Sequence, residues 1–475
     1  MITPLPSSSS EPNPVARWVA VADVLTVTGV ALAAAVMIGG GFRFWLADVR
    51  ISVTSPTRLL AYTFLVGLVR HVAMPRPTLL SRAVDVARRV RQAEAWSAVW
   101  PAFVVTRATV MVVGLLAVHT VGFPPQAPPF RISSNEAINL PARWDAGWYL
   151  GIASTGYQWR SAGATTQQNV AFFPAFPAIT HVVGRVLGGS LLAYVAAGLF
   201  VSYSAFFWSL LYVYQLARSE LGSAEKAAWA VWLLAAYPFS LFHGAMYSES
   251  LFLLGCVGAV VELRNDRPMR AAAWGLLVGL SRPNGFLLAA TLAALVGSWL
   301  MRTRCTPWSR QGLMRASAIG APVAGMLVYS IYVARLTGNA FQWSAQHVVW
   351  GRTFTGLSPF VDAADVVANQ GFGTYIATAP YDVLNAAAVA TAISLVIPIW
   401  RYFGVPYVVF VCVNLLPPLF RGGVMSMGRL SATLFPLFLC LALRLDSRGA
   451  LWLTVAFAAL QAFLAVLFYT WRPLF

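Results

Sequence analysis

The sequence predicts an all-α polytopic membrane protein of about 13 transmembrane helices. Of its 475 residues, 59% are hydrophobic and only 10% are charged, whereas a soluble domain carries about 25% charged residues. The formal net charge of +17 comes almost entirely from arginines. These lie in short loops between apolar runs, as the positive-inside rule predicts for a membrane protein. We therefore expect the positive charge to set topology, and we expect no nucleic-acid partner.

The N-terminal region divides into a polar tail and a pair of predicted spans. Residues 1–14 are rich in Ser and Pro and lack the basic and apolar regions of a signal peptide, so we expect a disordered tail. Within residues 15–98, apolar runs cover about 20–46 and 59–74. The most basic segment follows and should be cytoplasmic; it contains Arg76, Arg82, Arg88, Arg89 and Arg91.

The third run, about 99–121, should cross outward and begin a first outer loop, 122–190. Residues 171–188 within this loop could form another span. A span there would place Arg218 and Lys226, the only lysine, on the outer face and invert every later loop. We therefore expect an interfacial helix instead, held at the headgroup level by its aromatic residues Phe172, Phe173 and Phe176.

The remaining spans are expected at about 191–216, 226–244, 247–263, 270–282, 284–301, 316–336, 381–400, 405–420, 429–445 and 449–470. The two around Ser281 are short, and we expect half-length helices that meet at 282–285, where Pro and Gly break the helix beside a polar cavity. A second outer loop, 337–380, should form amphipathic surface helices. We expect residues 99–445 to form one transmembrane module that contains both outer loops, and 446–475 to form the C-terminal span.

The first outer loop contains the best candidate for catalysis, Asp145. A helix that begins at Pro141 would place Asp145 and Tyr149 on one face, beside an apolar stripe with Trp144 and Trp148. A positioned carboxylate can take the proton of a hydroxyl as that hydroxyl attacks. The alternative is a surface helix with a solvated Asp–Arg pair. Other acids expected on this face are Asp48, Glu136, Glu249, Asp362, Asp365 and Asp382.

Four motifs in order resemble the PIG-V (GPI mannosyltransferase II) family of GT-C membrane glycosyltransferases: 143–157, 171–177, 247–252 and 281–285. The resemblance implies a GT-C type bundle, a polyprenyl-phosphate sugar donor, usually mannose, and a lipid- or glycan-linked acceptor. It also implies inversion at the anomeric carbon, with Asp145 as the base. Residues expected to bind substrate are Arg143, Trp144, Trp148, Tyr149, Tyr247, Glu249, Arg282, Asn284 and Arg429.

Several of these residues have alternative interpretations. Glu249 could bind sugar hydroxyls, orient an arginine, or serve only as a favourable charge at a helix N-terminus. Arg282 is expected to bind phosphate or to have a structural role at the helix break. Arg429 begins a span on the outer face, where a cation breaks the positive-inside pattern, so a phosphate partner is expected. Arg143 could instead pair with Asp145.

We expect no cofactor and no metal, because the motif has one Asp and the histidines His181, His243 and His347 lack ligand spacing. Rival functions are a transferase that uses another lipid-linked sugar, such as arabinofuranose or glucose, a transporter or lipid flippase coupled through Asp145 and Glu249, and a structural subunit. The Arg-rich composition suggests a GC-rich bacterial genome. We therefore expect a multi-pass protein of the bacterial plasma membrane, with its site on the extracytoplasmic face.

Overall fold

The computed structural model describes residues 17–39, 42–46, 49–75, 78–82, 93–128, 130–161 and 165–474. The predicted tail 1–14, Asp48 and the arginines Arg76, Arg88, Arg89 and Arg91 lie outside these residues. The chain forms two compact units. One contains residues 1–92 and 185–190, and the other contains 93–184 and 191–475.

The first unit pairs two helices around a small charged cluster. Helices α1 (Arg17–Gly39) and α2 (Pro56–Ala73) pack together, and Ser55 caps the start of α2 by accepting a hydrogen bond from the Arg58 amide. Asp23 binds Arg70 at 2.7 Å and also binds Arg82. Because Arg70 is almost fully buried, this pairing compensates its charge inside the helical hairpin.

The first predicted span, 20–46, is wrong at its C-terminal end. Helix α1 stops at Gly39, and strands β1 (Phe42–Leu46) and β2 (Val49–Val53) form an antiparallel hairpin in which Phe42 pairs with Val53. The β-branched and aromatic residues of this stretch favour a strand over a helix. An apolar run alone does not distinguish the two structures.

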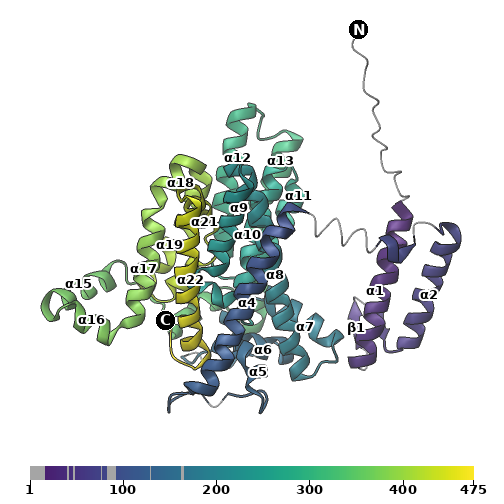
Figure 1. Ribbon diagram of the computed structural model, residues 1–475, viewed down its shortest axis with the longest axis horizontal. Helices are drawn as coiled ribbons and strands as arrows, with labels where there is room; N and C mark the ends of the chain where they lie inside the picture. Colours follow the sequence, from purple (N-terminus) through teal and green to yellow (C-terminus); the bar gives the residue numbers. More distant parts are fainter. Residues whose placement is uncertain are drawn as a thin grey trace, which may run out of the picture. The chain divides into compact units, whose positions relative to one another are not determined.

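The second unit is a bundle of long helices (Figure 1). Figure 1 shows α5 and α6 at one end of the bundle and α18 and the turn between α12 and α13 at the other. Its main helices are α4 (Glu94–Thr120), α8 (Leu191–Leu221), α9 (Ala224–Ala236), α10 (Glu249–Arg264), α11 (Pro268–Gly279), α12 (Leu288–Thr303), α13 (Arg310–Thr337), α17 (Pro380–Ser394), α18 (Val396–Phe403), α19 (Val405–Phe420), α21 (Phe435–Arg444) and α22 (Ser447–Tyr469).

Local capping explains several of the helix starts. Ser223, Ser309 and Asp446 accept hydrogen bonds from backbone amides in the first turns of α9, α13 and α22, respectively. These side chains satisfy amides that have no partner within the helix. Gly338, with φ +83°, ends α13 in the left-handed conformation, which glycine adopts at little cost.

Helix α10 lies at the core of this unit. Every residue from Glu249 to Leu263 is buried, so this helix contacts protein on all sides. Helix α11 packs closely against α13, where a Cβ atom on Gly279 would lie 2.0 Å from the Pro322 carbonyl oxygen. Small residues at such crossings allow membrane helices to approach closely, so a larger side chain at position 279 would force α11 away from α13.

The predicted membrane fold is confirmed, although the count of about 13 spans is not. Described helices lie in all the predicted ranges, but only seven are long and apolar enough to cross a membrane. An eighth is obtained if η4 (Pro238–Gly244) and α10, which are bent by 102°, form one broken span. Two half-length helices were expected around 282–285. Helix α11, with 12 residues, is of that length, whereas Gly285–Thr303, with 19 residues, is long and apolar enough to cross a membrane.

The first outer loop contains the short helices α5 (Glu136–Asn139), η1 (Leu140–Ala142), α6 (Ala146–Thr155), η3 (Asn169–Ala171) and α7 (Ala175–Val186). At 12 residues, α7 is too short to cross a bilayer. The expected anchoring by Phe173 and Phe176 is wrong, since both rings are buried in protein. Phe173 packs on Tyr329 and Phe176 on Tyr149, so these aromatics join the loop to the bundle.

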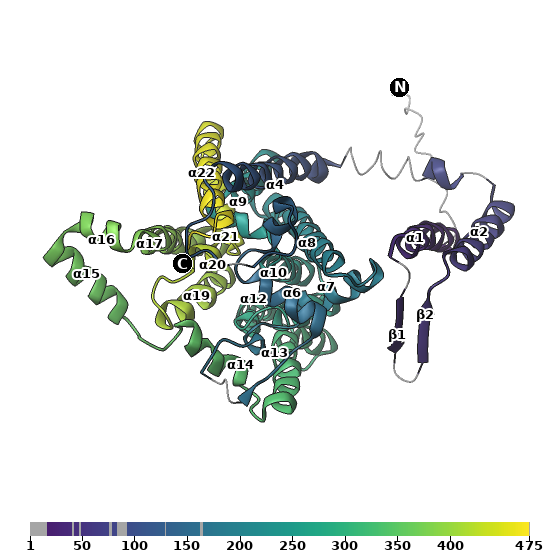
Figure 2. The same ribbon diagram turned by 90° about the horizontal axis from the view of Figure 1, so that it is seen from below.

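The second outer loop contains α14 (Gln342–Ala345), η6 (Gln346–Trp350), α15 (Ser358–Gln370) and α16 (Phe372–Thr378). Helices α15 and α16 have no buried residue and project sideways from the second unit in both views (Figures 1 and 2). The preceding segment is tied to the bundle, since the amides of Thr355 and Gly356 donate to the Phe420 carbonyl. The start of this loop therefore lies beside the end of α19.

Candidate active site

A cavity of about 1060 Å³ opens at the end of the bundle that carries α6. Its walls come from α6, the segment before α7, the turn before α12, η6 and the segment that joins α19 to α21. Asp145 is the only carboxylate among the lining residues. Four arginines also line the cavity, namely Arg282, Arg352, Arg421 and Arg429.

Asp145 lies immediately before α6 rather than within a helix that begins at Pro141. Pro141 belongs to the separate turn η1, Arg143 is extended, and Trp144 has a left-handed φ of +57°. The Asp145 amide donates to the Tyr247 hydroxyl (3.1 Å), which in turn donates to the Arg143 carbonyl (3.2 Å). This bend holds the carboxylate at the cavity wall.

The Asp145 carboxylate belongs to a chain of ion pairs. Its Oδ2 atom lies 2.6 Å from Nη1 of Arg429, and Arg429 Nε also donates to Glu249 Oε1. Arg282 Nη1 donates to the same Glu249 oxygen at 2.7 Å. Two acids and two arginines therefore alternate in the order Asp145, Arg429, Glu249 and Arg282, and their formal charges cancel.

Glu249 is central to this chain and is fully buried. It begins α10, directly after the Tyr247–Ser248 bend, and it does not line the cavity. Of the alternatives open for Glu249, the structure favours a role in orienting Arg282 and Arg429. Its place at the N-terminus of α10 also stabilises the carboxylate through the helix dipole. Contact with sugar hydroxyls would require its buried oxygens to be uncovered.

Arg143 does not pair with Asp145. Its Nη2 donates to Glu136 Oε2 at 2.7 Å, and its guanidinium lies over the rings of Phe123 and Trp471. Burial lowers the pKa of Arg143 from its ordinary value, and the Glu136 carboxylate opposes this shift. Glu136 and Asp145 lie nine residues apart, and the turn η1 lets the loop carry Arg143 back onto α5 and away from Asp145.

The predicted substrate-binding residues fall into two groups. Trp144, Trp148, Tyr149, Asn284, Arg282 and Arg429 line the cavity, whereas Arg143, Tyr247 and Glu249 are buried behind its wall. The second group thus differs from expectation, because its side chains are buried away from the cavity. Tyr247 illustrates this, since its ring packs under the Arg429 guanidinium at 4.5 Å.

Tyr149 and Asn284 are held by single hydrogen bonds. The Tyr149 hydroxyl lies 2.8 Å from the Ser248 hydroxyl, and Asn284 Nδ2 donates to Asn414 Oδ1 at 2.8 Å. Burial raises the pKa of Tyr149 to about 12, so its hydroxyl stays protonated at neutral pH. Tyr149 can therefore donate a hydrogen bond to a ligand but cannot serve as a base there.

Sequence reasoning missed two cavity arginines, Arg352 and Arg421. Arg352 Nη2 donates to the Met425 carbonyl (3.1 Å), and Arg421 Nη1 donates to Ser344 Oγ (3.5 Å). In the described part of the chain, neither forms an ion pair with a carboxylate. Burial lowers the pKa of Arg352 to about 10. For Arg352, the only signal in the sequence was its place in an aromatic-rich outer loop.

An aromatic cluster forms another part of the wall. Trp148 stacks on Phe172 with ring centroids 5.8 Å apart, and Trp350 meets both rings edge-on at 5.5 and 5.4 Å. All three residues line the cavity. Such rings present apolar faces to a ligand while arginines bind its charged part.

The fold and the cavity together define a polytopic membrane protein whose cavity is lined by aromatic rings and by four arginines. Residues 103–304 match the model of the family described as mannosyltransferase (PIG-V), which confirms the resemblance seen in the four motifs. The matched segment includes Asp145, Glu249 and Arg282, whereas Arg352, Arg421 and Arg429 lie beyond it.

Two curated relatives are similar over parts of their length. GPI alpha-1,6-mannosyltransferase 2 from Cricetulus griseus is 32% identical over 156 residues, which are 31% of this chain and 29% of the relative. GPI mannosyltransferase 2 from Drosophila pseudoobscura pseudoobscura is 28% identical over 225 residues, 43% of this chain and 47% of the relative. The chain thus spans less than half the length of these two relatives.

Solved structures match over much of the chain but share little sequence with it. The oligosaccharyltransferase AglB from Archaeoglobus fulgidus matches with 13% identity and a TM-score of 0.41, over 77% of this chain and 56% of that one. ArnT from Cupriavidus metallidurans, bound to undecaprenyl phosphate, matches with 13% identity and a TM-score of 0.42, over 77% and 75%.

Proposed function

We propose that this protein is a GT-C type glycosyltransferase that transfers a sugar, mannose in the first instance, from a polyprenyl-phosphate donor to a hydroxyl of a lipid- or glycan-linked acceptor. The observation that carries this proposal is a cavity with one carboxylate, Asp145, among four arginines and a wall of aromatic rings. A donor of this class has an apolar chain, a phosphate and a sugar, and each finds a matching surface. The similarity to PIG-V mannosyltransferases supports the choice of mannose.

In the proposed reaction, Asp145 acts as the general base. Arg429 binds Oδ2, and within the described residues no hydrogen-bond partner is found for Oδ1, so Oδ1 is available to the acceptor hydroxyl. As the acceptor oxygen bonds to the anomeric carbon, its proton passes to Asp145 and the bond from carbon to phosphate oxygen breaks. Attack opposite the leaving group inverts the anomeric carbon, so a β-linked donor yields an α-glycoside.

We assign the leaving phosphate to Arg352, assisted by Arg421. Breaking the bond to the sugar adds negative charge to the phosphate, and preorganised cations stabilise that charge. Arg282 and Arg429 already share the Glu249 carboxylate, whereas Arg352 is half-buried without an acidic partner in the described residues. An arginine in this state gains most from an anionic ligand.

The same set of groups supports a reaction without a metal. A single lining carboxylate offers few hard oxygen ligands, and the arginines can neutralise the phosphate.

We also propose that the site faces the extracytoplasmic side of a bacterial plasma membrane. The opposite ends of α10, α12 and α21 carry Arg264, Arg302 and Arg444 in their last turns, and such residues favour the cytoplasmic side.

The test is transfer from labelled polyprenyl-phosphate mannose in membranes that contain the wild-type protein, Asp145→Asn or Asp365→Asn. Loss of a general base typically costs about 10²- to 10⁴-fold, and we expect that loss for Asp145→Asn. Asp365 is an exposed acid on α15, and its change should leave the rate intact. Wild-type transfer by folded Asp145→Asn would exclude the base assignment. Parallel donors with arabinofuranose or glucose test the choice of sugar.

A further inference from the structure

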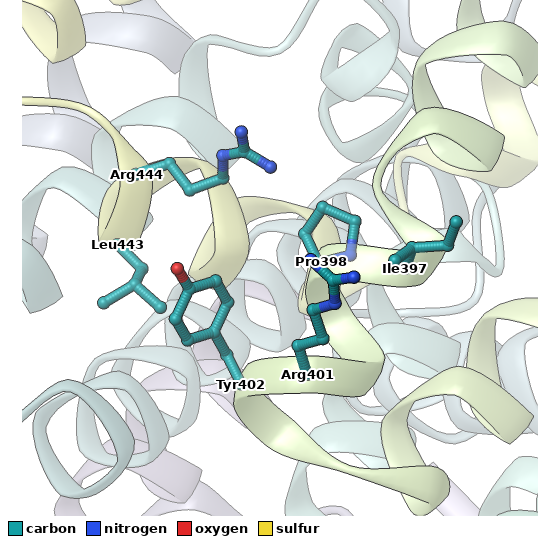
Figure 3. A pocket seen from close by; sticks show the side chains of 6 residues that line it. All are labelled: Ile397, Pro398, Arg401, Tyr402, Leu443 and Arg444. Atoms are coloured by element: carbon teal, nitrogen blue, oxygen red, sulfur yellow. The ribbon is translucent and has the colours of Figure 1, made fainter.

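A second pocket, of about 400 Å³ (Figure 3), lies beside α18, at the end of the bundle opposite α6 (Figure 1). It is formed by α18 and the last turn of α21, and it is lined by Ile397, Pro398, Arg401, Tyr402, Leu443 and Arg444. Figure 3 shows the Arg401 and Arg444 guanidiniums and the Tyr402 hydroxyl around the same hollow. Its volume falls within the range of sites for small ligands.

The charge around this pocket is positive and uncompensated. In the described residues, no carboxylate forms an ion pair with Arg401 or Arg444, although Arg264 at the same end pairs with Glu220. Lys226 of α9 donates to the carbonyl of Leu443 at 2.7 Å, which brings a third cation beside the pocket. Two cations that line one pocket favour the binding of an anion between them.

Two acids near the start of α22, Asp446 and Glu225, are engaged elsewhere. Asp446 accepts the Gly449 amide at 2.8 Å as the cap of α22, and Glu225 accepts a hydrogen bond from the Ser447 hydroxyl. These bonds turn both carboxylates toward the start of α22. The arginines therefore have guanidinium donors available for a ligand from outside the chain.

Exposed apolar side chains surround the same end of the bundle. Ile397, which lines the pocket, and Trp400 on the same helix are each 58% exposed, and Trp452 on α22 is 71% exposed. Tryptophans are enriched where a membrane protein meets the headgroup level, and apolar surface next to them faces acyl chains. A ligand with an anionic head and apolar tails would match both surfaces at once.

We propose that this pocket binds the phosphate of an anionic phospholipid headgroup, with Arg401 and Arg444 donating to the phosphate oxygens and Tyr402 donating from its hydroxyl. Basic pockets between transmembrane helices bind such headgroups in other membrane proteins. The site is separate from the catalytic cavity, because no residue lines both and α18 lies at the end of the bundle opposite α6. The inference therefore stands independently of the proposed function.

The experiment is a native mass-spectrometry titration of the full-length protein in detergent. The probes are dioctanoyl phosphatidylglycerol, dioctanoyl phosphatidylcholine and inorganic phosphate. The variant Arg401→Gln/Arg444→Gln removes both cations, and Arg302→Gln/Arg310→Gln removes two exposed arginines that do not line the pocket. Since each arginine near an anionic headgroup contributes about fivefold in affinity, the first variant should bind phosphatidylglycerol roughly 25-fold more weakly.

The control variant should bind phosphatidylglycerol like the wild type, and phosphatidylcholine should bind both proteins weakly. Equal binding of phosphatidylglycerol by the wild type and by folded Arg401→Gln/Arg444→Gln would overturn the site. Displacement of the lipid by an equal concentration of inorganic phosphate would overturn the lipid as its occupant. Thermal unfolding of both variants shows whether they are folded, and exposed arginines should be replaceable without loss of the fold.

Discussion

The Asp145 carboxylate and the Arg429 guanidinium are 2.6 Å apart, although 284 positions separate these residues in the sequence. Arg429 also binds Glu249, so the first outer loop, the start of α10 and the segment before α21 meet at one guanidinium. A base held by a partly buried ion pair keeps its geometry before substrate arrives, which lowers the cost of orienting it. This arrangement makes the site sensitive to residues that no substrate touches.

Replacing Glu249 by Gln should destabilise the protein and reduce transfer. Glu249 is fully buried and neutralises both Arg282 and Arg429. Breaking a buried pair while its charged partners remain costs about 3–5 kcal/mol. The thermal midpoint in detergent should fall, and kcat should fall with it because Arg429 no longer has its second partner.

The matched control is Glu262→Gln, at the other end of the same helix. Glu262 is also buried, but its arginine partner Arg267 lies 3.6 Å away and is 54% exposed, so the cation that Glu262→Gln leaves behind stays in solvent. If Glu262→Gln lowers the midpoint as far as Glu249→Gln does, the central role of Glu249 is refuted. In a double-mutant cycle, the double variant Glu249→Gln/Arg282→Gln should lose less free energy of unfolding than the sum of the losses in the two single variants.

Replacing Arg352 by Gln should separate donor binding from stability. This arginine has no acidic partner in the described structure, so its loss should leave the thermal midpoint unchanged or raise it. Its proposed contact with the donor phosphate is charge-assisted and worth about 1.5–3 kcal/mol, so the KM for polyprenyl-phosphate mannose should rise roughly tenfold or more.

Arg335→Gln is the matched control for Arg352, since Arg335 is an exposed arginine in the last turn of α13. It should leave both KM and the midpoint at their wild-type values. An Arg352→Gln enzyme with the wild-type donor KM would assign the phosphate to another cavity arginine. Loss of stability in that variant would instead indicate a structural role for Arg352.

The sequence predicts much of this site because its motifs are local, but it leaves the long-range partners open. Asp145 stood out as an acid among tryptophans, and the helix break around Arg282 was visible from Pro and Gly. The alternative pairing of Arg143 with Asp145 is wrong, because η1 turns the chain so that Arg143 binds Glu136. Arg352 could not be found, since its importance depends on which distant carboxylates the fold leaves away from it.

Replacing Tyr149 by Phe should change the rate modestly and leave the pH profile intact. Burial raises the pKa of Tyr149 to about 12, so the hydroxyl stays protonated throughout the range from pH 6 to 9. The change removes one hydrogen bond to Ser248, worth about 1 kcal/mol. The transfer rate plotted against pH from 6 to 9 should have the same shape in both proteins. If the wild-type rate falls at alkaline pH and the Tyr149→Phe rate does not, Tyr149 is a titrating group.

His347 should make the protein less stable in acid. Burial, with Arg352 and Arg421 adding positive charge, lowers the pKa of His347 from 6.5 to about 4. Between these two pH values the unfolded chain binds a proton that the folded protein does not. Stability therefore falls as the pH drops from 6.5 to 4. Outside that window the contribution of His347 to stability no longer changes with pH. His347→Asn should therefore lose less thermal midpoint between pH 7 and 4.5 than the wild type, by roughly 2 °C or more.

The control for His347 is His119→Asn, an exposed histidine in the last turn of α4, which should keep the wild-type slope of midpoint against pH. Arg352→Gln should act in the same direction as His347→Asn, because removing a neighbouring cation raises the pKa of His347 toward its ordinary value. Identical slopes of midpoint against pH for the wild type and all three variants would show that His347 binds its proton equally well in the folded and the unfolded protein. That outcome would mean that the cavity arginines exert little positive potential at this wall, and it would also weaken their assignment to the donor phosphate.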